Sequence, residues 1–184
     1  MAKKKYSTAK NISLTEFIEQ RKAIENPNEQ SLFDFLFTTG ARISEVLPIT
    51  PEDINQNDLS VGLRTLKNPI DRYRTVVFFP QEPTLLQSIL ETTANTKPTK
   101  RIWNFTRQRA WTLCKRYFNC KDHSFRHSNA ILCAKPPVNM NAPELKARFG
   151  WARLASAENY LKWNYAESMA QKMELKTPTE LGLV

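Results

Sequence analysis

Two arginine-containing segments and one tyrosine carry the side chains best suited to chemistry on a phosphate ester. The first segment is Thr39-Gly40-Ala41-Arg42-Ile43-Ser44-Glu45. It joins a glycine turn to the start of a helix, where free backbone amides and a guanidinium both favour a bound phosphate. This predicts an anion site at Arg42, with Glu45 as a support that orients the guanidinium or only solvates the helix.

The second segment, His123-Ser124-Phe125-Arg126-His127, contains both histidines of the chain. His123 and Arg126 are three positions apart (126 minus 123), so on a helix or its first turn both side chains can face one ligand. A third segment starts at Gly150-Trp151 and reaches Tyr160 nine positions after the tryptophan (160 minus 151). It presents an aromatic hydroxyl just ahead of an apolar helical stretch.

In this order the three segments resemble the tyrosine recombinase and integrase family. The pattern of that family is an Arg in a Thr-Gly-x-Arg-x-x-Glu box, a His-x-x-Arg box, a His or Trp after Gly, and then a Tyr. The resemblance covers roughly residues 28 to 165, and residues 103–111 are also similar to integrases of archaea and their mobile elements. The order of the boxes is far more specific than any single box.

The resemblance implies a catalytic role for six positions, a supporting role for Glu45 and His127, and no cofactor or metal. The hairpin lysine of the family falls on Lys67, although the same hairpin also offers Arg64, Arg72 and Arg74. Tyr165, five positions past Tyr160 (165 minus 160), is a weaker candidate nucleophile because it points elsewhere on the same predicted helix. The expected catalytic residues are Arg42, Lys67, His123, Arg126, Trp151 and Tyr160, the last as the nucleophile.

These residue types match the demands of transesterification at a phosphodiester. Guanidinium groups stabilise the charge that builds on the non-bridging oxygens, and an indole N–H adds a neutral donor. A tyrosine with a free pKa near 10 needs nearby cations and a base such as His123 to attack. Lys67 could protonate the departing 5′ oxygen, and the resemblance implies a 3′-phosphotyrosyl intermediate.

Composition agrees with a DNA-binding domain. The 184 residues are 41% hydrophobic and 24% charged, with a net charge of +9 and a pI near 9.6, which suits one globular domain that meets a polyanion. Basic residues lie in several segments rather than on one amphipathic helix, which favours DNA over a membrane surface. Residues 106–118 mix aromatic and basic side chains, as a DNA-binding helix or merely a solvated one would. The expected DNA contacts are Arg72, Arg74, Arg107, Arg109 and Lys115.

Periodicity predicts a mainly α fold with a small antiparallel β-sheet, as in the tyrosine recombinase catalytic domain. Asn28 is expected to cap a buried helix over 31–38 that stops at Gly40, and a short helix follows until Pro48. Residues 59–67 and 73–79 predict a hairpin with Lys67 near its tip. Further helices are expected near 85–92, 106–118, 124–134, 143–149 and 155–175. Residues 1–12 are interpreted as a basic flexible arm and 13–184 as the catalytic domain, without the N-terminal DNA-gripping domain of the family.

The three cysteines form no disulfide framework, and no secretory leader or membrane span is apparent, so a cytoplasmic protein is expected. Cys114 and Cys133 lie among apolar residues and are predicted to be core side chains. Together, Cys114, Cys120, His123 and His127 suggest a zinc site only superficially, because the spacing lacks the long separation of a finger.

The sequence therefore favours an integrase-type recombinase that acts on mobile-element DNA. The alternatives are a type IB topoisomerase-like enzyme, in which the same strand reseals after rotation, and a non-catalytic DNA-binding regulator of the same fold. Double-stranded DNA is the expected partner of a chain that is monomeric in solution and a homo-tetramer on DNA. The helical tail with Met169, Met173 and Leu175 would dock on a neighbouring protomer or on its own core.

Overall fold

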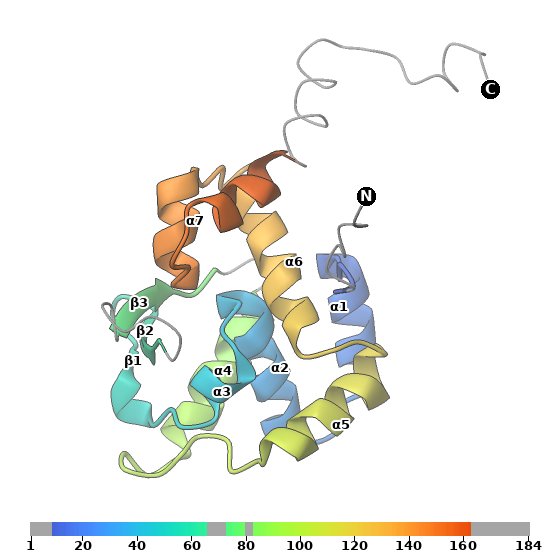
Figure 1. The fold of residues 1–184 in the computed structure, drawn as a ribbon. Coiled ribbons are helices and arrows are strands. Elements are labelled where there is room, and N and C mark those ends of the chain that lie inside the picture. Colours follow the sequence, from blue (N-terminus) through green and yellow to red (C-terminus); the bar gives the residue numbers. More distant parts are fainter. Residues whose placement is uncertain (1–8, 66–72, 80–82, 163–184) are drawn as a thin grey trace, which may run out of the picture.

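The computed structural model describes residues 9–65, 73–79 and 83–162. These residues form a mostly helical fold with one small antiparallel sheet (Figure 1), so the predicted fold class is confirmed. The helices are α1 (Leu14–Arg21), α2 (Pro27–Thr39), α3 (Ile43–Val46), η1 (Pro51–Asp53, a 3-10 turn), α4 (Pro83–Ala94), α5 (Arg107–Phe118), α6 (His123–Ala134) and α7 (Ala142–Phe149). Residues 155–162 are also helical.

The sheet is formed by β1 (Ile54–Asn55), β2 (Ser60–Arg64) and β3 (Tyr73–Val77), in that spatial order. Strands β2 and β3 pair antiparallel with Val61 opposite Val76, which confirms the predicted hairpin. The two-residue strand β1 is too short to show an alternating pattern and was not predicted. The hairpin tip, where Lys67 and Arg72 were expected, lies outside the described residues.

Helix α2 is the central buried helix, and every residue from Ser31 to Thr39 is buried. The predicted cap at Asn28 is wrong, because Asn26 caps the helix. The Asn26 Oδ1 accepts from the backbone N–H of Asn28 at 3.0 Å and of Glu29 at 3.2 Å. Pro27 then takes the first helical position, where its missing N–H costs nothing. At the other end the predicted stop is confirmed: Gly40 is left-handed (φ 62°).

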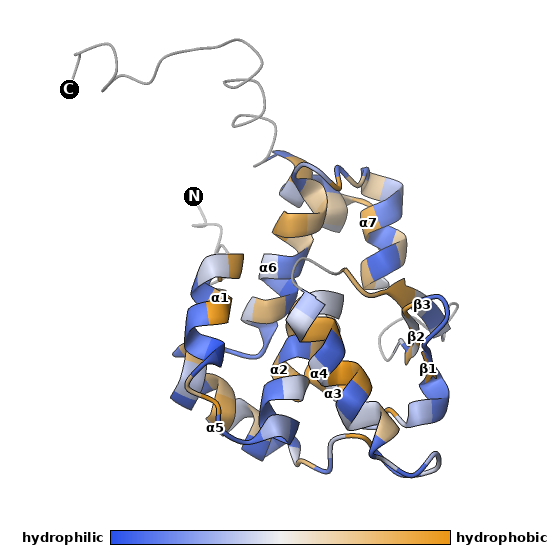
Figure 2. Cartoon of the chain, turned by 180° about the vertical axis from the view of Figure 1, so that it is seen from behind, coloured by the Kyte–Doolittle hydropathy of each residue, from blue (hydrophilic) through white to orange (hydrophobic). Residues whose placement is uncertain are grey.

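The core lies between α2 and the helices around it. Phe17 of α1 stacks on Phe37 of α2 with ring centroids 4.1 Å apart, and Phe118 of α5 meets Phe125 of α6 edge-on at 5.0 Å. Polar and apolar residues mix along α1, α5 and α7, as expected of helices that bury only one side (Figure 2). Thus α6, which carries the His-x-x-Arg segment, is held from several sides.

The end of the predicted basic arm packs against α6. The Oγ atoms of Ser124 and Ser128 accept from the backbone N–H groups of Lys10 (3.2 Å) and Ile12 (2.7 Å), and Ile12 is fully buried. Helix α1 follows at once, capped by Ser13, and was not predicted. Residues 1–8 lie outside the described part of the chain.

The helices after the sheet agree with the prediction to within one or two residues at each end. Of the predicted helix over 155–175, residues 155–162 are helical and the remainder lies beyond the described residues. Within the ranges that the structure covers, no helix has the length and apolarity needed to cross a membrane.

Candidate active site

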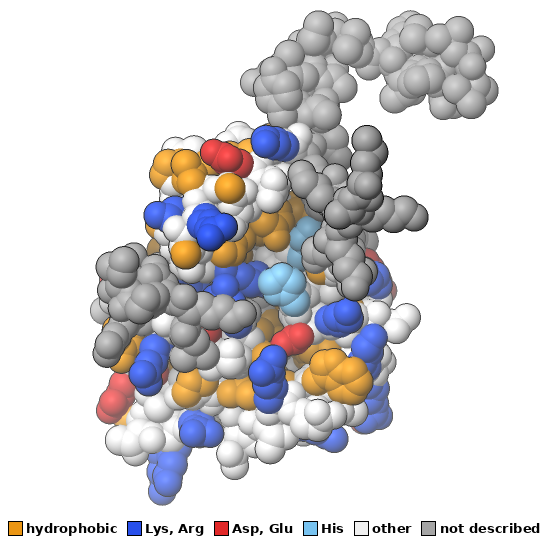
Figure 3. All heavy atoms as spheres, viewed as in Figure 1, with side chains coloured by type: hydrophobic (Ala, Val, Ile, Leu, Met, Phe, Trp, Pro, Cys, Tyr) orange, Lys and Arg blue, Asp and Glu red, His pale blue; other side chains and the backbone are white. Residues whose placement is uncertain are grey.

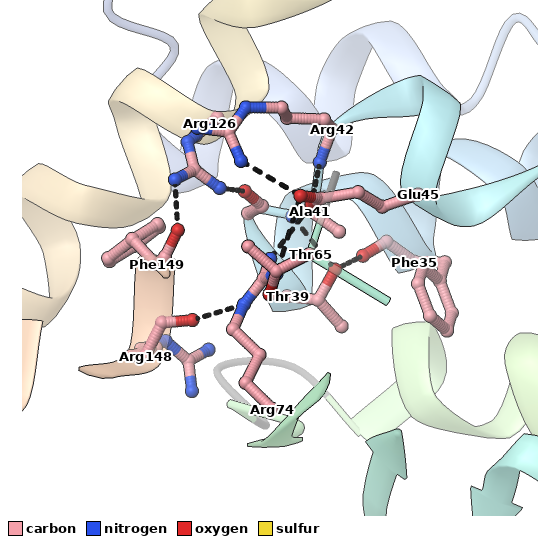
Figure 4. A network of polar contacts seen from close by, with 11 residues as sticks. Phe35, Thr39, Ala41, Arg42, Glu45, Thr65, Arg74, Arg126, Arg148 and Phe149 are labelled. Carbon is pink, nitrogen blue, oxygen red and sulfur yellow. Dashed lines mark hydrogen bonds and ion pairs between the residues drawn. The ribbon is translucent and has the colours of Figure 1, made fainter. Parts of the chain in front are cut away.

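Three elements far apart in the sequence bring their arginines to one place. Arg42 follows the Gly40 turn and stands at the start of α3, Arg126 comes from α6, and Arg74 comes from β3. Figure 4 shows the side chain of Arg42 running over that of Arg126, with Arg74 approaching from the sheet. The charge of Arg42 is close enough to lower the pKa of Arg126. The two arginines expected at one phosphate are therefore neighbours.

Glu45 stands at the centre of this arginine cluster, and its side chain is fully buried. Its carboxylate accepts from Arg42 Nη1 at 2.8 Å and from the backbone N–H of Arg42 at 2.9 Å. It also accepts from Arg74 Nη2 at 2.8 Å and Nη1 at 3.3 Å. Burial alone would raise the pKa of Glu45, but the hydrogen bonds and charges of Arg74 and Arg42 outweigh it and hold the pKa below its usual range. One carboxylate thus orients two guanidinium groups.

Arg126 is only 1% exposed and is held by backbone carbonyls. Its Nη1 donates to the Gly40 carbonyl at 3.1 Å, and its Nη2 donates to the Phe149 carbonyl. Its Cζ lies 5.6 Å from the centroid of the Trp151 ring. Burial, and then the Arg42 charge, lower its pKa to about 9, so the group remains a cation at neutral pH. In the described part of the chain no carboxylate forms an ion pair with Arg126, and neutral carbonyls do not cancel its positive charge, so this cation can attract an anion.

The predicted nucleophile lies beside this cation. The rings of Tyr160 and Trp151 stack with centroids 5.3 Å apart and an interplanar angle of 9°. The Tyr160 hydroxyl is 3.3 Å from His127 Nδ1, one residue after Arg126. Burial raises the pKa of Tyr160, and the charge of Arg126 opposes that rise. Trp151 therefore touches both the cation and the phenol.

The two histidines of α6 are placed differently. His123 is exposed at the first turn of α6, whereas His127 is buried against Tyr160. Loss of water around the ring, followed by the charge of Arg126, lowers the pKa of His123, and burial lowers that of His127. His127 Nδ1 thus lies within hydrogen-bond distance of the tyrosine hydroxyl. A role of His123 as a base stays a prediction.

Among the predicted DNA contacts that lie in the described residues, Arg74 points inward. Its side chain is 8% exposed, and besides Glu45 it binds the Thr65 hydroxyl at 3.0 Å and the Arg148 carbonyl at 2.9 Å. Neither Thr65 nor Arg148 was predicted to belong to the site. A cation in the last helical turn before Gly150 was the one available signal for Arg148.

The other described DNA candidates lie on the outer side of α5. Arg107 and Lys115 are exposed, and Arg107 and Gln108 line a shallow hollow with Trp111, which is 45% exposed. Arg109 instead pairs with Glu29 of α2 at 2.7 Å. Figure 3 shows Lys and Arg side chains around the histidines and over α5 on this face. The exposed Arg107 and Lys115 make this face basic.

A zinc site finds no support in the described part of the chain, where no group of three or more potential ligands gathers. Cys114 and Cys133 are buried, as predicted for core side chains; Cys120 is buried as well, and all three thiols are free. Burial raises the pKa of each thiol, that of Cys120 to about 11.

Comparison with known proteins places this geometry in a known fold. No family model and no curated protein sequence matches the chain. Among solved structures, XerA recombinase is 15% identical, with a TM-score of 0.67 over 91% of this chain and 66% of that one. XerH site-specific recombinase, bound to a palindromic difH substrate in a post-cleavage complex, is 16% identical, with a TM-score of 0.69 over 92% and 54%.

The catalytic domain of bacteriophage HP1 integrase is 17% identical, with a TM-score of 0.60 over 84% of this chain and 86% of that domain. The chain thus spans less than two thirds of the XerH chain and nearly all of the isolated HP1 domain. The matches do not bear on the similarity to archaeal integrases. The mostly helical architecture, its three-stranded sheet and these matches show that this chain has the tyrosine recombinase catalytic-domain fold.

Proposed function

We propose that the chain is a tyrosine site-specific recombinase or integrase, which cleaves and rejoins DNA strands through a 3′-phosphotyrosyl intermediate. One observation carries the proposal. The Trp151 ring lies against both the Arg126 guanidinium (5.6 Å) and the Tyr160 ring (5.3 Å), with Arg42 next to Arg126 (Figure 4). A phosphate bound by the two arginines would therefore lie within reach of a phenol from the same chain.

In the proposed reaction Arg42 and Arg126 bind the non-bridging oxygens of the scissile phosphate. Among the described residues, the Arg42 guanidinium donates only through Nη1, to Glu45, which leaves its Nε and Nη2 for a phosphate, and the side chain is partly exposed. The charge that develops on those oxygens strengthens both contacts, so they favour the transition state over the ground state. The Trp151 N–H would be a further, neutral donor.

Tyr160 supplies the nucleophilic oxygen. A bond forms between its Oη and phosphorus, the bond from phosphorus to the 5′ oxygen breaks, and the phenol proton passes to a base. Among the described residues, His127 Nδ1 is a candidate base within hydrogen-bond distance, at 3.3 Å, and His123 is the candidate that the family pattern favours. The departing 5′ oxygen takes a proton from a general acid, for which Lys67 is the sequence candidate. A 5′ hydroxyl then reverses the step, and no ATP is consumed.

Double-stranded DNA is the proposed substrate. The charge of +9 favours a polyanion, and the exposed Arg107 and Lys115 on α5, together with Arg72 of the hairpin, would bind its backbone. XerH bound to difH DNA and the Tn1549 transposon integrase in complex with a circular intermediate DNA share this fold. We further propose a monomer in solution that assembles as a homo-tetramer on DNA, and action on chromosomal or mobile-element DNA inside the cell. Residues from 13 onward would make up the catalytic domain.

The test traps the covalent intermediate. A pool of duplexes with a randomised centre and a nick on one strand is incubated with the protein, and adducts that survive detergent are isolated and sequenced. We expect an adduct with the wild type, none with Tyr160→Phe, and an undiminished yield with Tyr117→Phe. Tyr117 is a matched control because its hydroxyl binds Glu29 at 2.9 Å, away from the arginine cluster. An adduct with Tyr160→Phe, or binding without any wild-type adduct, would contradict the proposal.

The same preparations separate recombination from its alternatives. Exchange between two copies of the selected site indicates a recombinase, whereas relaxation of a supercoiled plasmid without exchange indicates a topoisomerase-like enzyme. Tight binding of DNA with neither activity indicates a regulator.

A further inference from the structure

The C-terminal end of α7 provides carbonyl acceptors to two arginines of the cluster. Gly150 is left-handed (φ 58°) and ends the helix. The N–H groups of Gly150 and Trp151 then donate to the carbonyls of Ala147 (3.1 Å) and Lys146 (3.0 Å), as in a Schellman cap. Two of the terminal carbonyls remain, those of Arg148 and Phe149.

Each of those two carbonyls accepts a hydrogen bond from a guanidinium group. The Arg148 carbonyl accepts from Arg74 Nε at 2.9 Å, and the Phe149 carbonyl accepts from Arg126 Nη2. Both cations also lie at the negative end of the helix dipole of α7, which favours them there. The position of this helix end therefore sets where Arg74 and Arg126 point.

The side chain of Arg148 anchors that helix end. It is 9% exposed, and its Nη1 donates to the Val77 carbonyl at 2.8 Å while its Nη2 donates to the Thr38 carbonyl at 3.0 Å. Its Nε lies 3.4 Å from Asn129 Oδ1. These acceptors belong to β3, α2 and α6, so a single guanidinium ties α7 to three elements.

Burial of the Arg148 cation is an unfavourable way to anchor a helix if stability is the only purpose. In the described part of the chain no carboxylate pairs with Arg148, and burial lowers its pKa. A buried cation without a counter-ion loses hydration that carbonyl groups replace only partly. An apolar side chain would fill the same space at lower cost, which suggests that the hydrogen-bonding geometry is what the site requires.

We propose that Arg148 is a positioning residue: its buried side chain fixes the C-terminal end of α7, so that the Phe149 carbonyl orients Arg126 for the phosphate and the Arg148 carbonyl holds Arg74 against Glu45, the carboxylate shared with Arg42. The inference rests on the proposed function for its effect on cleavage. The orientation itself is a property of the protein without DNA.

The variants are Arg148→Met, which keeps the length of the side chain but removes every donor, and Arg148→Lys, which keeps the charge with one donor nitrogen. Arg21→Met is the matched control. It breaks a largely buried ion pair between Arg21 of α1 and Asp34 of α2 (2.7 Å), so it also lowers stability but leaves α7 untouched. All measurements are made below the melting temperature of the least stable variant.

In the first experiment, covalent adduct formation is timed at saturating DNA, and DNA affinity is measured separately. We expect Arg148→Met to slow cleavage about 10- to 100-fold, as loss of an orienting partner does, with affinity within about twofold of wild type. Arg148→Lys should recover part of the rate, and Arg21→Met should cleave normally. An unchanged rate in Arg148→Met, or an equal loss in Arg21→Met, would overturn the inference.

The second experiment does not depend on cleavage. Hydrogen exchange of the Arg74 Nε–H, assigned by its loss in Arg74→Lys, is followed by NMR in the DNA-free protein. We expect exchange to be at least about tenfold faster in Arg148→Met and unchanged in Arg21→Met, because only the former releases the carbonyl that this N–H binds. Equal protection in both variants refutes the positioning role. A wild type that forms no adduct would refute the proposed function and leave this measurement valid.

Discussion

Replacing Glu45 by Gln tests the electrostatic logic of the arginine cluster. The substitution keeps the shape of the side chain but removes the charge and turns one acceptor oxygen into an amide donor. Arg42 and Arg74 would lose their common carboxylate, to which they donate four hydrogen bonds. Two come from Arg42, through its backbone N–H and its Nη1, and two come from the guanidinium of Arg74. We expect a large loss of stability.

The size of the expected loss of stability follows from how deeply the ion pairs of Glu45 are buried. Removing one partner of a buried ion pair costs about 3–5 kcal/mol, and the lower end applies because the Arg42 side chain remains 21% exposed. A loss of about 3 kcal/mol lowers the melting temperature of a domain of this size by roughly 6–12 °C. Glu19→Gln is the control: Glu19 pairs with Lys22, but both side chains are more than half exposed, so no measurable change is expected.

The stability that Glu45 contributes depends on pH with a defined sign. Because the folded-state pKa of Glu45 is depressed, its contribution is fully present above the unfolded value of about 4.3 and is lost as the pH falls through the lower folded value. The difference between wild type and Glu45→Gln in urea unfolding should therefore be constant near neutral pH and shrink in acid below about pH 4.

Sulfate provides a second check. In Glu45→Gln the cluster loses its carboxylate, so an added divalent anion should stabilise the variant more than the wild type at equal ionic strength. The reasoning fails if Glu45→Gln melts at the wild-type temperature, or if sulfate shifts both proteins equally.

Three further predictions concern other parts of the structure. Gly40→Ala should lower stability by more than about 2 kcal/mol in urea unfolding, because φ is +62° and the new Cβ would lie 2.6 Å from Phe149 Cε1; an unchanged midpoint would contradict this. For DNA binding, Arg107→Gln should reduce the slope of log K against log salt by about 1, and Arg109→Gln by less because that side chain is already ion-paired; equal slopes would argue against α5 as the contact. The three buried thiols should resist a thiol reagent at pH 8 in the native state and react fully in denaturant, as counted by mass spectrometry, since burial raises each pKa; fast native labelling would show that they are accessible.

Local patterns account for much of the agreement between sequence and structure. The apolar run of α2, the glycine that stops it and the alternation of the hairpin each depend on residues close together in the chain. The same holds for the error at Asn28: Asn26 and Asn28 are both good caps, and the choice was decided by Pro27, which suits the first helical position. Helix α1 and strand β1 were missed because each is short and weakly patterned.

For the candidate site too, the sequence predicted some features and left others open. The residue types and chain order of Arg42, Arg126 and Tyr160 can be read from the sequence, and they led to the prediction that one site contains all three. The structure places Arg42 beside Arg126 and places Tyr160 against Trp151, which also lies against Arg126. Which histidine contacts the tyrosine was not predicted, because helical spacing gives the relative directions of His123 and His127 but not the direction from which Tyr160 approaches.

Only the folded chain shows that Arg74 turns inward to Glu45 and that Arg148 holds the end of α7. Three of their acceptors are backbone carbonyls, those of Arg148, Val77 and Thr38. Every residue carries such a carbonyl, so no residue type marks these contacts in advance. They arise where separate elements end side by side, and packing of the whole domain sets that geometry.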